Sequence, residues 1–168
     1  MNKGSVFYRW LFYGAAAGLF LLVQALLCNR LHLWGVHPFL PPVLAAVASV
    51  WEDRQESLCA AAVFGLLCDL TTSPPFPAFY TVLFALTALL AGLIAKYLIM
   101  PGFFCALTAS AAALVLHGVF HALALTTRGV SDLTAAAVLT GRETLLTLPL
   151  VPLVYLLFRA IHRRFPAE

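Results

Sequence analysis

Residues 10–29 read WLFYGAAAGLFLLVQALLCN, a run of 20 residues without a charged side chain. A helix of about 20 mostly apolar residues is long enough to cross the hydrocarbon core of a bilayer. The run is too long for the apolar region of a typical cleavable signal peptide, and no small-x-small cleavage site follows it. The sequence therefore predicts a first membrane span that stays in the protein.

The composition of the whole chain extends this interpretation. Of its 168 residues, 62% are hydrophobic and 10% are charged, against a usual charged fraction of about 25%. A water-soluble domain of this size could not hide so much apolar surface, because small folds keep a large share of their surface exposed. The net charge of +3 is too small to indicate nucleic acid as a partner. We expect one polytopic transmembrane domain over residues 1–168, with the lipid bilayer as its solvent.

Charge-poor stretches and prolines place the other helices. Proline suits the first turn of a helix, so the second helix should start near Pro41 or Pro42, after an irregular approach. Pro149 and Pro152 should kink the last helix, whose freed carbonyls a neighbouring helix must then cover. The predicted fold is an all-α membrane protein, a bundle of about six transmembrane helices at residues 10–28, 41–51, 54–72, 77–97, 102–125 and 139–158. If the stretch 31–51 turns back instead of spanning, five crossings result.

Basic residues in the short loops predict the orientation of the chain. With the N-terminus in the cytoplasm and six crossings, seven basic residues fall on the cytoplasmic side and three on the outer side. The seven are Lys3, Arg9, Arg54, Lys96, Arg159, Arg163 and Arg164, and the three are Arg30, Arg128 and Arg142. This bias predicts that both termini are cytoplasmic. The mixed charges of residues 52–56, Glu-Asp-Arg-Gln-Glu, indicate a solvated loop.

Asp69 lies in the apolar run FGLLCDL at residues 64–70. A carboxylate inside a membrane helix costs on the order of 2.5–3.5 kcal/mol on insertion scales, so it should face protein rather than lipid. Two roles remain open, a proton or ligand site and a buried acceptor that fixes its helix to the following Ser73-Pro74-Pro75 turn. We favour the structural role, because a proton relay normally has a second ionisable partner in the membrane. On this basis Asp69→Asn should be almost neutral.

Two other polar pairs are candidates for chemistry. His117 and His121 are four residues apart and share a helix face, and this spacing can hold a metal. No acidic or cysteine ligand accompanies them, so interhelical hydrogen bonding is the preferred role. Arg142 and Glu143 fall at the start of the predicted sixth helix, where a glutamate suits the helix dipole. We interpret them as an ion pair or cap at the rim of the bundle.

Small residues indicate where helices can approach closely. Gly14 and Gly18 form a GxxxG pattern in the first span, which allows contact within the bundle or with a partner. The sequence shows no Ser–His–acid combination, no Gly-rich phosphate loop and no zinc-binding cluster. It predicts a protein that is not an enzyme, with no catalytic, cofactor-binding or metal-binding residues. The structural and interaction candidates are Asp69, Gly65, Gly14, Gly18, His117 and His121.

The segment from Pro42 to Tyr97 resembles the MreD family of bacterial rod shape-determining membrane proteins. The matching elements are Pro42-Val43-Leu44, the polar loop 52–57, the core Gly65-Leu66-Leu67-Cys68-Asp69-Leu70, and Gly92-Leu93-Ile94-Ala95-Lys96. Helix number, chain length and the basic C-terminus are also similar. The family in turn resembles the six-helix membrane component of energy-coupling-factor transporters, which is the architecture that the resemblance implies.

The resemblance also implies a function. MreD-like proteins are non-enzymatic scaffolds of the elongasome in the bacterial cytoplasmic membrane. They bind the bitopic protein MreC and act indirectly with MreB, RodA and a class B penicillin-binding protein in lateral peptidoglycan synthesis. The alternative is a substrate-binding membrane subunit of an energy-coupling-factor vitamin transporter. The small number of polar groups expected in the outer half of the bundle favours the scaffold.

Overall fold

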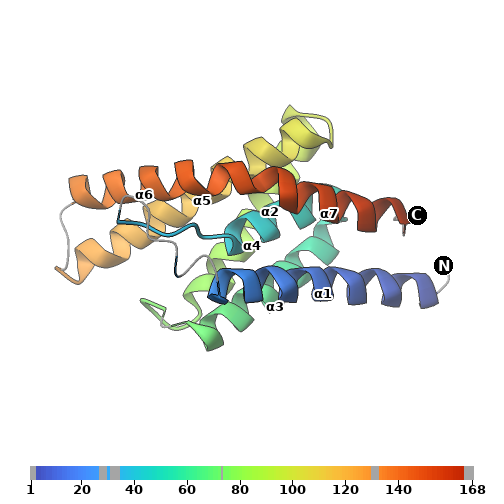
Figure 1. The fold of residues 1–168 in the computed structure, drawn as a ribbon, viewed down its shortest axis with the longest axis horizontal. Coiled ribbons are helices and arrows are strands. Elements are labelled where there is room, and N and C mark those ends of the chain that lie inside the picture. The colour runs from blue at the N-terminus through green and yellow to red at the C-terminus, as the bar shows by residue number, and fades with distance from the viewer. Residues whose placement is uncertain (1–2, 27–29, 31–34, 73, 130–132, 165–168) are drawn as a thin grey trace.

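The computed structural model describes residues 3–26, 30, 35–72, 74–129 and 133–164 (Figure 1), and the regular elements in these ranges are helices. The first four are α1 (Lys3–Leu26), α2 (Pro41–Trp51), α3 (Arg54–Thr71) and α4 (Phe79–Leu93). A π-helix, η2 (Ile94–Leu98), continues α4 and is followed by α5 (Phe103–Thr127). The chain ends with α6 (Leu133–Thr147), a short 3-10 helix η3 (Leu148–Leu150) and α7 (Val151–Arg164).

The two ends of the bundle differ in what they carry. Figure 1 shows both termini at one end, together with the α2–α3 turn and, further up, the α4–α5 connection. The end of α3, the start of α4, the end of α5 and the start of α6 lie at the opposite end. We call the first of these the terminal end of the bundle. The seven basic residues that the sequence assigns to the cytoplasm all lie in helices, namely Lys3 and Arg9 in α1, Arg54 in α3, Lys96 in η2, and Arg159, Arg163 and Arg164 in α7. The side of the membrane that the terminal end faces stays a prediction.

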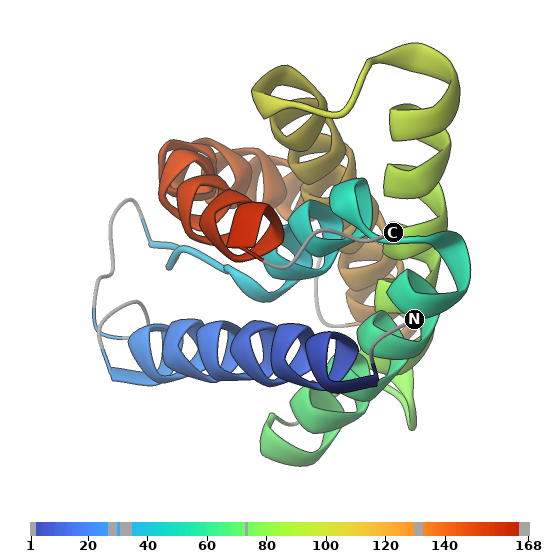
Figure 2. The ribbon, with the colours of Figure 1, turned by 90° about the vertical axis from the view of Figure 1, so that its right-hand side faces the viewer.

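Helix α2 lies at the centre of the bundle (Figure 2). Nine of its eleven residues are buried, and it contacts α3, α4, α5 and α7. At about 1.5 Å per residue, α2 is roughly 16 Å long, about half the thickness of a hydrocarbon core. It begins at Pro41, where the sequence analysis places its start. The irregular segment 35–40 precedes it, and a full crossing by the stretch 31–51 stays a prediction.

The irregular segment 35–40 runs beside α6 toward the middle of the bundle (Figure 1). Irregular backbone at membrane depth is tolerated only where other parts of the protein satisfy its polar groups. Gln24 of α1 does this twice, because its Nε2 donates to the Pro38 carbonyl at 2.8 Å and its Oε1 accepts from the Leu40 N–H at 3.0 Å. Thr147 Oγ1 of α6 accepts from the Phe39 N–H at 3.1 Å. Side chains of α1 and α6 therefore stabilise the approach to α2.

Three helical stretches are long and apolar enough to cross a membrane, namely Phe79–Leu98, Phe103–Thr127 and Thr134–Arg164. The apolar part of α1, Trp10–Leu26, and α2 are shorter. The protein is thus an all-helical chain with three candidate membrane-spanning helices in its described part. Six crossings remain a prediction.

The last helix differs from its predicted bounds. It starts at Leu133 rather than residue 139 and continues to Arg164 rather than 158, so the preceding loop is shorter than expected. The run of alanines at 135–137 has a high helix propensity, whereas the predicted start relied on the position of charges. Pro149 lies in η3, where the helix tightens to 3-10 geometry between α6 and α7. The expected proline effect therefore takes the form of a change in helix type.

Candidate functional site

The closest helix contact at the predicted sites is between α3 and α4, at Gly65. A Cβ atom added to Gly65 would lie 2.5 Å from the Thr81 Cα and 2.6 Å from the Tyr80 carbonyl oxygen. Both neighbours are backbone atoms, so no side-chain rotation can make room. Gly65 is required because it allows the two helices to approach at this depth.

Asp69 lies one turn after Gly65 and accepts hydrogen bonds from the start of α4. Its Oδ1 accepts from the Tyr80 N–H at 2.9 Å. Its Oδ2 accepts from the Thr81 N–H at 3.0 Å and from the Thr81 hydroxyl at 2.7 Å. The first amides of a helix have no partner within the helix, and Ala78, the residue before α4, supplies no side-chain cap to any described residue.

Asp69 therefore caps α4 from the neighbouring helix α3. Its negative charge also lies at the positive end of the α4 dipole, which compensates for its unfavourable position near the C-terminus of α3. From the sequence, Asp69 is expected to hold the Ser73-Pro74-Pro75 turn. The observed partners lie beyond that turn, in α4, and Gly65 and Asp69 together form the α3–α4 junction.

Substitutions at Asp69 should distinguish the contributions of its two carboxylate oxygens to stability. Asp69→Leu leaves two amides without an acceptor, at about 1–3 kcal/mol each, so membrane abundance and the thermal unfolding midpoint in detergent should both fall strongly. Asp69→Asn keeps one acceptor oxygen and should give an intermediate midpoint, rather than the nearly neutral result that the sequence alone suggests. Asp53→Leu, at an exposed position before α3, is the control. A wild-type midpoint for Asp69→Leu would contradict the capping role.

The glycines of α1 are not involved in packing within the described chain. The buried face of α1 carries Tyr13, Ala16 and Phe20, and the Tyr13 ring stacks on Phe158 of α7 with ring centroids 5.3 Å apart. A Cβ atom added to Gly14 or Gly18 would meet no described atom within 4 Å. The GxxxG pattern therefore presents an open surface beside the α1–α7 contact.

This open surface forms one wall of a groove of about 730 Å³ between α1, α2 and α3. We call it the α1–α3 groove. Small residues line much of it: Gly14, Ala17 and Gly18 from α1, Ala45 and Ala48 from α2, and Cys59 and Ala60 from α3. Because these side chains are small, another molecule could approach the walls of the groove closely.

The groove becomes acidic toward the α2–α3 turn, where Glu52 and Glu56 line it. Glu52 is buried, and its Oε1 lies 3.8 Å from His162 Nδ1 of α7. The His162 ring also stacks on Trp51, with ring centroids 5.0 Å apart. The prediction of a solvated loop at 52–56 is therefore wrong for Glu52, because α7 covers the turn.

His117 and His121 lie on α5 and take part in ring stacking. The His117 ring is 4.6 Å from Phe39, 5.8 Å from His121 and 6.1 Å from Tyr80, between centroids. His117 is buried, and its Nδ1 makes no hydrogen bond to a described residue. The described chain contains no group of three or more His, Cys, Asp or Glu side chains placed to bind a metal ion. The contacts shown for the His117 ring are therefore stacking contacts, and the interhelical hydrogen bond expected for this pair stays a prediction.

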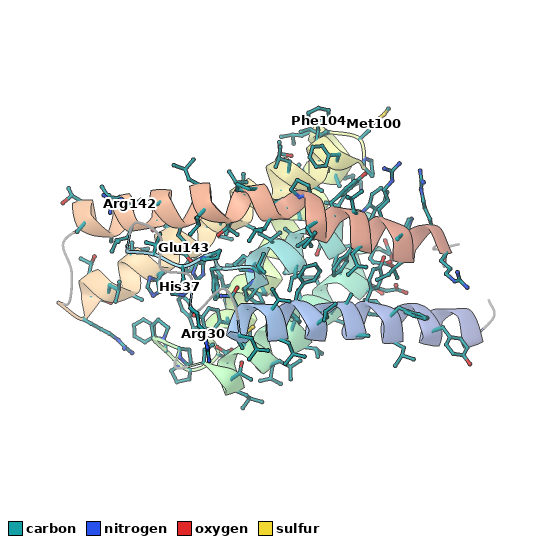
Figure 3. The ribbon with its side chains drawn as sticks, viewed as in Figure 1. Arg30, His37, Met100, Phe104, Arg142 and Glu143 are labelled. Carbon is teal, nitrogen blue, oxygen red and sulfur yellow. The ribbon has the colours of Figure 1, made fainter. Side chains whose placement is uncertain are left out.

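Arg142 and Glu143 lie in the third turn of α6, so they are not a helix cap. Arg142 is exposed, whereas Glu143 is partly buried. Figure 3 shows Glu143 on the side of α6 that faces the segment carrying His37. Its backbone carbonyl accepts from the Thr147 hydroxyl at 2.7 Å, and that hydroxyl oxygen is the acceptor for Phe39. Glu143 therefore lies next to Thr147, the residue of α6 that supports the irregular segment 35–40.

Gln24 and Thr147 are the important residues that sequence reasoning missed. Two features of the sequence could have indicated them. Gln24 is an amide in an otherwise apolar run, and Thr147 lies two residues before Pro149. Tyr80 connects two of the predicted sites, since its N–H donates to Asp69 and its ring stacks on His117. Comparison with protein-family models, with curated proteins and with solved structures gives no match for this chain.

Proposed function

We propose that this chain is a non-enzymatic membrane scaffold whose α1–α3 groove holds the single transmembrane helix of a partner protein. The observation that carries the proposal is the pair Gly14 and Gly18, which line the groove although the described packing does not require glycine at either position. In lipid, helix association depends on close packing at small residues, since the hydrophobic drive between helices is absent. A lipid acyl chain does not require small residues in the walls of its groove. The small residues that line this groove therefore favour a helix as its occupant.

The charges of the groove suggest the chemistry of that partner. Glu52 and Glu56 line the groove near the terminal end of the bundle. Single-span proteins carry Lys and Arg at the cytoplasmic flank of their helix. A partner helix with small residues along one face and a basic residue at its cytoplasmic flank would match both the walls and the acidic end. This orientation requires the terminal end to be cytoplasmic, as the basic-residue bias predicts.

The resemblance of residues 42–97 to the MreD family supports a specific partner class. MreC-like proteins are bitopic, so they would offer one helix to the groove. On this proposal the chain belongs to the bacterial cytoplasmic membrane, with both termini in the cytoplasm. It would support lateral peptidoglycan synthesis by holding the MreC-like protein, and through it would act with MreB, RodA and a class B penicillin-binding protein.

Filling the groove tests the proposal. Gly14→Leu/Gly18→Leu should reduce co-purification of the MreC-like partner by about tenfold, corresponding to about 1.4 kcal/mol, and should give rounded cells in a rod-shaped host. The fold should be unaffected, because side chains at both positions extend into open space. Ala15→Leu/Ala25→Leu adds bulk to exposed positions of α1 outside the groove and is the matched control.

Three outcomes would overturn the scaffold proposal. The first is wild-type recovery of the partner with the doubly substituted protein at normal abundance. The second is loss of a co-purified phospholipid while the partner is retained, which would identify an acyl chain as the occupant. The third is tight binding of a vitamin together with an ATPase module, which would support the transporter alternative.

A further inference from the structure

A second cavity, of about 350 Å³, lies between the α2–α3 turn and the end of α4. Its α4 side is shaped by η2, where the Ile99 N–H donates to the Ile94 carbonyl at 3.0 Å. Such π-turns are rare and occur frequently at functional sites. The η2 residues Lys96 and Tyr97 line the cavity, and Arg54 of α3 lines it as well. Two cations from separate elements thus share one cavity.

The walls of this cavity change from apolar to polar. Ala88, Leu89 and Leu93 of α4 form the apolar part, and Ser49, Asp53, Arg54, Ser57 and Lys96 form the polar part. Lys and Tyr side chains are typical of the zone where a membrane meets water. The cavity therefore has the polarity of a phospholipid, with a head-group region adjoining an acyl-chain region.

The charges of the cavity indicate which head group fits. Arg54 and Lys96 are positive, and Glu52 and Asp53 are negative. The first turn of α3 begins at Arg54, and Asp53 makes no side-chain cap to the described residues, so the partial positive charge of that helix end adds to the cations. Glu52 already lies beside His162, which leaves Asp53 as the exposed carboxylate. The cavity therefore offers two cations for a phosphate and one exposed carboxylate for an ammonium group, which favours a head group that carries both charges.

We infer that this cavity binds a phospholipid with an amine-bearing head group. The phosphate lies between Arg54 and Lys96, the ammonium group lies against Asp53, and an acyl chain follows Leu89 and Leu93. This site is separate from the α1–α3 groove except at the α2–α3 turn, and the inference does not depend on the proposed partner.

Native mass spectrometry of the full-length protein, released from detergent with added phosphatidylethanolamine, tests the inference. The wild type should retain one phosphatidylethanolamine more tightly than phosphatidylglycerol. An exposed ion pair contributes at most about a fivefold effect on affinity, so the loss of both cations in Arg54→Gln/Lys96→Gln should weaken phosphatidylethanolamine binding by up to roughly 25-fold. Arg163→Gln is the control, because it removes an exposed positive charge from α7 outside the cavity.

A second variant guards against a general loss of charge or of fold. Asp53→Asn removes only the carboxylate and should shift the preference toward phosphatidylglycerol. Equal wild-type affinity for the two lipids would overturn the inference, as would a double variant that binds no more weakly than Arg163→Gln. Displacement of the lipid by millimolar inorganic phosphate would also overturn it, because the ligand would then be a soluble phosphate.

Discussion

Gln24→Leu should greatly lower both the thermal unfolding midpoint in detergent and the amount of protein in the membrane. The substitution removes the acceptor for the Leu40 N–H and the donor to the Pro38 carbonyl, in a buried part of the bundle. Each unsatisfied backbone group costs about 1–3 kcal/mol, so the combined effect is about 2–6 kcal/mol. Gln55→Leu, at an exposed position, is the control and should leave the midpoint nearly unchanged.

Thr147 provides an independent check on the same segment. Thr147→Val removes the acceptor for the Phe39 N–H, whereas Thr147→Ser keeps it. The valine variant should therefore be less stable than the serine variant, although valine retains more of the buried volume. If Gln24→Leu and Thr147→Val both unfold like the wild type, the irregular segment does not need these side chains, and its hydrogen bonds are not what stabilises the approach to α2.

Gly65→Ala should be the most damaging single-methyl substitution among the glycines of α3 and α4. The added Cβ would lie 2.5 Å from a backbone atom of α4, so the helices must separate, and overpacking of this kind typically costs about 1–3 kcal/mol. Separation would also lengthen the hydrogen bonds from Tyr80 and Thr81 to Asp69. We expect a lower unfolding midpoint and reduced membrane abundance.

Gly92→Ala in α4 is the matched control for Gly65→Ala. A Cβ atom there would meet no described atom within 4 Å, and alanine is favoured over glycine in a helix by about 0.5–1 kcal/mol. The two substitutions should therefore change stability in opposite directions. A Gly65→Ala protein as stable as the Gly92→Ala protein would show that the α3–α4 junction can relax without cost.

These stability effects bear on the proposed function through α3. This helix carries the α3–α4 junction on one side and a wall of the α1–α3 groove on another. Changes at Gly65 should weaken partner binding only as far as they lower abundance or move α3. Changes at Gly14 and Gly18 should weaken partner binding at normal abundance. The comparison distinguishes a role in assembling the bundle from a role in contacting a partner.

The sequence by itself was enough to predict that this chain is helical and that its helices are apolar enough for a membrane protein. Helical hydrogen bonds join residues four apart, and the apolar stretches are contiguous, so the information that specifies α2 or α5 lies within each segment. The start of α2 at Pro41 could be predicted for the same reason, because proline favours the first turn of the helix in which it lies. The cost of a carboxylate in an apolar helix also marked Asp69 as a residue that must face protein.

The tertiary structure decided what those residues contact. The acceptor role of Asp69 toward Tyr80 and Thr81, the support of segment 35–40 by Gln24 and Thr147, and the cover of Glu52 by α7 all join distant parts of the chain. Neither propensity nor periodicity contains such pairings, because they depend on how helices are placed against one another. In a bilayer every buried polar group needs a partner within the protein. The sequence therefore showed which groups needed partners, and only the packing of the helices determined which partners they have.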